Sequence, residues 1–82
     1  MKSYMSRPEA AEEFGMSQRE MFRLVDGIRE QIGRRYGEYA VIGRGKTTRV
    51  STVVLVDFLK HKNFIGTAFE QPFNEQEARR YL

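Results

Sequence analysis

"SRPEAAEEFGMSQREMFRLV", residues 6–25, predicts two short helices joined by a turn. A serine followed three residues later by a glutamate occurs twice in it, at Ser6–Glu9 and at Ser17–Glu20. This pattern is a capping box, in which the serine and the glutamate each bind a backbone N–H at the start of a helix. Gly15 suits the left-handed backbone that ends a helix. The order predicts a helix-turn-helix, although a plain helical hairpin has the same features.

The second helix is expected to run past the quoted stretch. Its apolar residues recur at helical spacing and predict one buried face, made of Met21, Leu24, Val25, Ile28 and Ile32. Gly27 has low helix propensity and allows a break at that point. Gly33 and Gly37 mark the exit from the helix.

A β-hairpin is expected next. Residues 39–42 and 47–50 read as two short strands around a GRGK tip. The two glycines of the tip, Gly43 and Gly45, permit the positive φ angles that a tight turn demands.

A third helix closes the predicted domain. Ser51 or Thr52 caps it, and its apolar side is made of Val54, Leu55, Phe58 and Leu59. We therefore predict an α+β fold with one domain over residues 1–66. Residues 67–82 form a C-terminal tail, in which a short helix starts at Asn74.

The composition predicts a single soluble globular domain. The chain has 82 residues, of which 40% are hydrophobic and 30% charged. It contains no cysteine, which suits a reducing cytoplasm and rules out disulfides and cysteine-bound zinc. We expect no metal site with a single histidine, no signal peptide and no membrane-spanning segment.

Residues 40–48, "AVIGRGKTT", fit a relaxed phosphate-binding loop, and "VVLVD" at residues 53–57 resembles a magnesium-binding strand. In such a loop, Lys-Thr opens a helix, and the acidic strand returns parallel after a crossover of a dozen or more residues. Only residues 48–52 separate the two motifs here. We therefore expect no nucleotide, no cofactor and no enzymatic activity.

Positive charge gathers in the middle of the chain. The formal net charge is +3, and residues 17–52 alone carry eight basic against four acidic residues. Residues 39–50 contain Arg44, Lys46 and Arg49 and no acid. A basic Gly-rich hairpin beside a helix-turn-helix is typical of a wing that grips the phosphate backbone of a polyanion. A solvated hairpin whose charges protect a strand edge is the alternative.

Three segments together resemble the excisionase-type, MerR-like winged-helix family. They are "YMSRPEAAEEFGMSQREMFRLV" (residues 4–25), the Gly/Arg hairpin and "RVSTVVLVDFLK" (residues 49–60), and the resemblance covers about residues 4–62. It implies a winged helix-turn-helix with the second helix in the major groove of DNA and the hairpin as its wing. The implied DNA-facing residues are Ser17, Gln18, Arg19, Phe22 and Arg23 of the helix, and Arg44, Lys46, Thr47 and Arg49 of the wing.

Family members similar to this chain act as recombination directionality factors of phages or integrative elements. They bind and bend double-stranded DNA near attachment sites, so that an integrase excises the element. The resemblance thus implies a bacterial cytoplasmic protein, nucleoid-associated when bound, with an integrase or a second copy of itself as further partner. Small transcriptional regulators of the same fold are one alternative, and a protein-interaction module that binds no DNA is another.

Two segments depart from the family pattern. The connector at residues 27–38 is long and basic at Arg34-Arg35, and the tail after Asn63 lies outside the resemblance. Both are candidates for contacts with a neighbouring protomer or an integrase.

We also expect particular positions or partners for several single side chains. Phe22 is expected at the surface, Tyr36 and Tyr39 beneath the hairpin, and His61 in solvent at the end of the third helix. Arg23 has a structural alternative, an ion pair along the solvated face of its helix.

Overall fold

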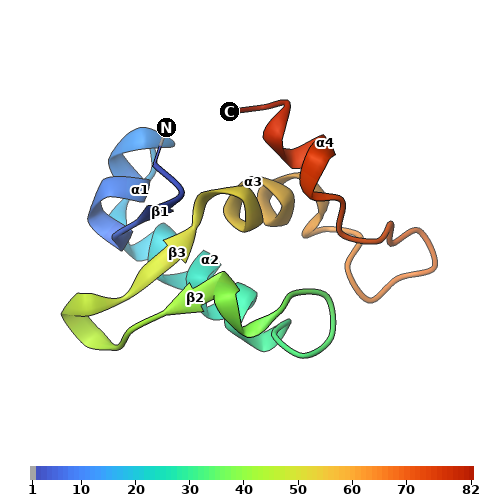
Figure 1. Cartoon of the computed structure of the whole chain (residues 1–82), viewed down its shortest axis with the longest axis horizontal. Coiled ribbons are helices and arrows are strands. Elements are labelled where there is room, and N and C mark those ends of the chain that lie inside the picture. Colours follow the sequence, from blue (N-terminus) through green and yellow to red (C-terminus); the bar gives the residue numbers. More distant parts are fainter. Residues whose placement is uncertain (1) are drawn as a thin grey trace.

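The computed structural model describes residues 2–82, and in this range it has four α-helices and a three-stranded antiparallel sheet (Figure 1). The α+β class predicted from the sequence is therefore confirmed. The helices are α1 Arg7–Glu13, α2 Gln18–Glu30, α3 Thr52–His61 and α4 Glu75–Arg79. The strands are β1 Tyr4–Met5, β2 Val41–Ile42 and β3 Arg49–Ser51, and two short 3₁₀ helices are η1 Glu38–Ala40 and η2 Gly45–Thr47.

Both predicted capping boxes are present. The Ser6 hydroxyl accepts from the backbone N–H of Glu9 at 3.2 Å, and the Ser17 hydroxyl accepts from that of Glu20 at 3.1 Å. Each glutamate in turn accepts from the backbone N–H of its serine. Between the two helices, Gly15 has a φ of 66°, the left-handed conformation expected there.

Helix α2 runs through Gly27 without a break. A Cβ atom at Gly27 would lie 2.7 Å from the Cζ atom of Phe58 on α3. The glycine therefore permits close approach of the two helices, and the packing outweighs its low helix propensity. The apolar face of α2 is buried as predicted at Met21, Leu24, Val25 and Ile28, whereas Ile32 follows the end of the helix and is only partly buried.

The sheet has one strand more than the sequence predicted. Strand β1 pairs with β3, placing Tyr4 opposite Ser51, and β3 also pairs with β2, placing Ile42 opposite Arg49. The strand order is β1-β3-β2. A strand as short as β1 shows no alternation, so no pattern could indicate it.

The hairpin strands are shorter than expected, because η1 and η2 occupy parts of the predicted segments 39–42 and 47–50. Residues 43–48, which we call the hairpin tip, extend beyond the β2–β3 ladder. Gly43 and Gly45 have φ angles of 79° and 53°, as predicted. A Cβ atom at Gly43 would lie 2.2 Å from the Thr47 carbonyl oxygen, so the tip demands glycine there.

Helix α3 is the centre of the core. Its cap is Ser51, whose hydroxyl accepts from the backbone N–H of Val54. Val54 and Leu55 are fully buried in the main core, among residues of α1, α2 and the sheet. None of the helices in residues 2–82 is long and apolar enough to cross a membrane.

The opposite side of α3 carries the C-terminal tail. The predicted tail helix is present as α4, with Asn74 as its cap. Val53, Val56 and Ala78 form a second apolar cluster between α3 and α4, and Phe73 packs against it. The tail thus covers apolar surface of the preceding residues.

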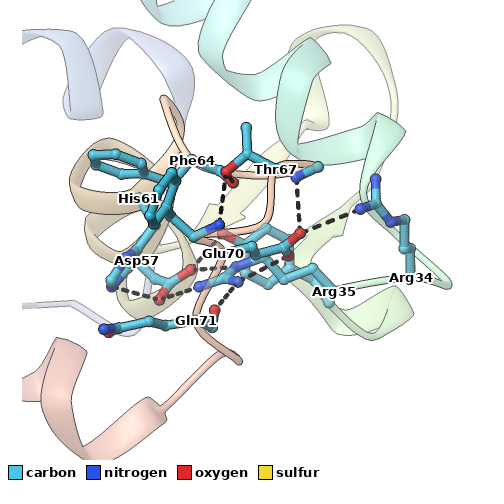
Figure 2. Close-up of polar contacts among 11 residues, drawn as sticks. Arg34, Arg35, Asp57, His61, Phe64, Thr67, Glu70 and Gln71 are labelled. Atoms are coloured by element: carbon cyan, nitrogen blue, oxygen red, sulfur yellow. Dashed lines mark hydrogen bonds and ion pairs between the residues drawn. The ribbon is translucent and has the colours of Figure 1, made fainter.

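The connector between α2 and the hairpin is tied to α3 by a buried ion pair (Figure 2). Arg35 and Asp57 face each other there, and Glu70 and Gln71 of the tail reach the same guanidinium. The Arg35 side chain is only 2% exposed, so it is unavailable to an outside partner. Burial alone would lower the pKa of Arg35, but the hydrogen bonds to Asp57 and the negative charge of that carboxylate outweigh this and raise it.

Of the expectations for single side chains in this region, burial of Tyr36 is confirmed and two others are wrong. Tyr36 is buried in the core that includes Ala40 and Val50 of the hairpin, with its ring perpendicular to that of Phe73 and its hydroxyl donating to Asp57. Tyr39 is 48% exposed. The His61 side chain is only 12% exposed, because the tail places Glu77 beside it, with Nε2 3.6 Å from Oε1.

Candidate nucleic-acid interface

An open cleft of about 400 Å³ lies between the first turns of α1 and α2 and the hairpin tip. Its lining residues are Ser6, Arg7, Pro8, Gln18, Phe22, Gly45, Lys46, Thr48 and Arg49. Three of these are basic and none is acidic. The cleft brings Gln18 and Phe22 of the predicted recognition helix together with Lys46 and Arg49 of the predicted wing.

The remaining predicted residues of α2 lie elsewhere on the helix. Successive residues of an α-helix are about 100° apart, so Arg19 lies about a quarter turn around α2 from Gln18 and outside the cleft lining. Arg23 lines a separate depression together with Glu20 and Lys62. Arg19 and Arg23 are both exposed, and neither forms an ion pair with another described residue. The ion pair considered for Arg23 is therefore not formed.

Phe22 lies at the surface, as expected, with 43% of its area exposed. The Arg7 guanidinium stacks over its ring, 3.8 Å from the centroid. Ser17, by contrast, uses its hydroxyl for the helix cap: it accepts from the Glu20 N–H and donates to the Glu20 carboxylate. The hydrogen bonds of the Ser17 hydroxyl are therefore used in the cap of α2.

The hairpin tip exposes two cations that the described residues leave without an ion pair, Arg44 and Lys46. Thr47 closes the turn, since its hydroxyl donates to the Arg44 carbonyl at 2.7 Å and accepts from the Arg44 N–H at 3.2 Å. Arg49 donates to the carbonyls of Lys46 and Thr48 and so braces the tip from inside. Arg44 and Lys46 are therefore the freely presented charges.

Two further arginines contact the hairpin tip from other elements, and neither was predicted from the sequence. Arg7 donates to the Gly45 carbonyl at 2.9 Å, and Arg29 donates to the Thr48 hydroxyl at 3.4 Å. Helical spacing could have indicated Arg29, because residues 18, 22 and 29 fall on one side of an α-helix. No sequence signal pointed to Arg7, because its partners lie far away in the chain.

The side of α1 that lies away from the hairpin tip is mainly acidic. A second depression there is lined by Lys2, Met5, Glu9, Glu12 and Glu13. Hydrogen bonds from Lys2 and Ser6 lower the pKa of Glu9 to about 2, so this carboxylate stays charged at neutral pH. A polyanion is repelled from this depression, which leaves the hairpin side of α1 as the basic one.

The phosphate-loop pattern has a different structure here. Gly45–Thr47 form a single 3₁₀ turn that leads into β3, where a phosphate-binding loop would lead into a helix. Asp57 lies on α3, is 3% exposed and is bound to Arg35 and Tyr36. Residues 2–82 contain no group of three or more side chains suited to hold a metal ion.

No family model, curated protein or solved structure matches this chain. The excisionase-type resemblance therefore remains a prediction from the residues that carry it.

Proposed function

We propose that this protein is a winged helix-turn-helix protein that binds double-stranded DNA. The main observation in support of DNA binding is the basic cleft between the first turn of α2 and the hairpin tip. Its lining includes Arg7, Lys46 and Arg49 and no acidic residue. Helix α2 enters the major groove, which admits a helix, and the hairpin tip rests as a wing on the adjacent backbone.

The exposed side chains divide into two roles. Arg44 and Lys46 contact phosphates, because they stand at the end of the hairpin without a carboxylate partner among the described residues. Gln18, Arg19 and Arg23 reach base edges from α2, where glutamine pairs with adenine and arginine with guanine. The apolar ring of Phe22 suits contact with a thymine methyl group.

Within this function, the family resemblance favours a recombination directionality factor. Such a protein binds near the attachment sites of a mobile element and bends the DNA, so that an integrase excises the element. A small transcriptional regulator would use the same interface. An integrase gene beside the coding sequence, and stimulation of excision in a reconstituted reaction, distinguish the first role from the second.

The test is a fluorescence-anisotropy titration with mixed-sequence duplex DNA at low and at moderate salt. We expect a log–log salt slope of about −3 to −4, corresponding to about four phosphate contacts. Arg44→Ala/Lys46→Ala should abolish most binding. The matched control, Arg79→Ala/Arg80→Ala, removes two charges from the end of α4, away from the hairpin tip (Figure 1), and should bind normally. Absence of binding at low salt, or equal loss in both double variants, would refute the proposal.

A further inference from the structure

Arg7 joins three separate elements. It is the first residue of α1, its guanidinium lies 3.8 Å above the centre of the Phe22 ring on α2, and its Nη2 donates to the Gly45 carbonyl of the hairpin tip at 2.9 Å. The contact with Gly45 spans 38 residues of chain. A single side chain therefore connects the start of α1 to the tip and to α2.

The backbone that carries Arg7 is itself held in place. Ser6 and Glu9 form the capping box around it, and Pro8 restricts the backbone of the first turn. Ala10 and Ala11, three and four residues after Arg7, are buried in the core that α1 shares with α2. The guanidinium thus extends from a fixed point of the domain.

The hairpin tip, by contrast, has few contacts with the rest of the molecule. The β2–β3 ladder ends at the pair Ile42 and Arg49, and the side-chain bonds of Thr47 and Arg49 stay within the hairpin. Among the side-chain hydrogen bonds of the described residues, only those from Arg7 and Arg29 reach the tip from other elements. The Arg29 bond is long, at 3.4 Å, and ends on Thr48 at the base of the tip.

We infer that Arg7 is a positioning residue, which fixes the hairpin tip against α2 so that both meet one DNA duplex in register. This inference rests on the proposed function. A tip that is already ordered before binding spares the complex the cost of ordering it. Phe22 contributes by presenting its ring face to the guanidinium, an arrangement that planar arginine provides and lysine does not.

The first test needs no DNA. The amides of Thr47 and Thr48 bind the carbonyls of Arg44 and Gly45, so their hydrogen exchange reports opening of the tip. We expect about tenfold faster exchange at both amides in Arg7→Ala, and faster exchange in Arg7→Lys as well. Arg80→Ala, which removes an arginine from the far end of the chain, should leave the exchange unchanged.

The second test measures duplex affinity against salt for the same variants. Arg7→Ala should weaken binding about tenfold with the salt slope unchanged, because the phosphate contacts of the tip still form in the complex. If Arg7 were itself a phosphate contact, the slope would fall by about 1, and Arg7→Lys would bind like the wild type.

The two tests distinguish a failure of the positioning role of Arg7 from a failure of the proposed DNA binding. Unchanged exchange at Thr47 and Thr48 in Arg7→Ala would overturn the positioning role, as would normal affinity in Arg7→Lys. A wild-type protein that binds no duplex at low salt would overturn the proposed function, while the exchange experiment would still decide whether Arg7 holds the tip.

Discussion

Arg35 and Asp57 form a two-pronged ion pair inside the protein, with Nε 3.0 Å from Oδ2 and Nη2 3.1 Å from Oδ1. Their side chains are 2% and 3% exposed. Tyr36 donates a third hydrogen bond to the same carboxylate, and Glu70 and Gln71 accept from the same guanidinium. The pair thereby locks the connector, α3 and the tail together.

Removal of one partner from this pair should be costly. Asp57→Ala leaves a buried guanidinium without its main counter-charge, and we expect a loss of about 3–5 kcal/mol in the free energy of unfolding. Urea denaturation measures the loss. The control is Glu75→Ala, which breaks the exposed Glu75–Arg79 pair and should cost less than about 0.5 kcal/mol. Similar losses in both variants would contradict the structural role of Asp57.

The tail should prove to be part of the folded unit. Phe73 packs its ring at 5.3 Å from that of Tyr36 and lies against the cluster of Val53, Val56 and Ala78. Because Phe73 is only partly buried, Phe73→Ala should lower the free energy of unfolding by about 2 kcal/mol, below the usual range for a core phenylalanine. Phe69→Ala is the control, since Phe69 is 78% exposed. No loss in Phe73→Ala would show that the tail stabilises nothing.

Gly27 should tolerate alanine poorly, although alanine is the better helix former. The added Cβ atom would lie 2.7 Å from the ring of Phe58, so the ring must shift. We expect Gly27→Ala to destabilise the protein by about 1 kcal/mol, where an unobstructed site would gain about that much. In a Phe58→Leu background the substitution should become neutral or stabilising. A double-mutant cycle with no coupling would contradict this packing.

Acid should weaken the attachment of the tail. The Gly66 N–H, followed by Arg35 and Arg34, lowers the pKa of Glu70 below the usual value of 4.5. A carboxylate with a lowered folded pKa stabilises the protein above its unfolded pKa, and this stability is lost as pH falls through the folded value. Unfolding stability should therefore decline below about pH 4.5, and less steeply in Glu70→Gln. An identical pH dependence in both proteins would contradict the assignment.

The parts of the fold that depend on neighbouring residues were predictable. The capping boxes of Ser6 and Ser17, the turn at Gly15 and the cap at Asn74 all rest on contacts within one turn of chain. The α2 face was predictable for the same reason, since helical period alone places Met21, Val25 and Ile28 on one side.

Features that depend on distant partners were not predictable. Arg35 reads as a surface charge in the sequence, and only the packing of α3 and the tail buries it beside Asp57. Arg7 likewise gains its role from Gly45, 38 residues away. Within the candidate site, the sequence indicated the basic and polar residues and the two elements that carry them, α2 and the hairpin. The cleft between these elements could be found only from the structure.

The most direct measurement is a backbone amide NMR titration of the protein with a mixed-sequence DNA duplex at low salt. We expect the shift changes to concentrate in the first turns of α1 and α2 and in residues 43–48, and α4 to stay unaffected. Changes confined to the tail, or no changes at any duplex concentration, would contradict the proposed DNA-binding surface.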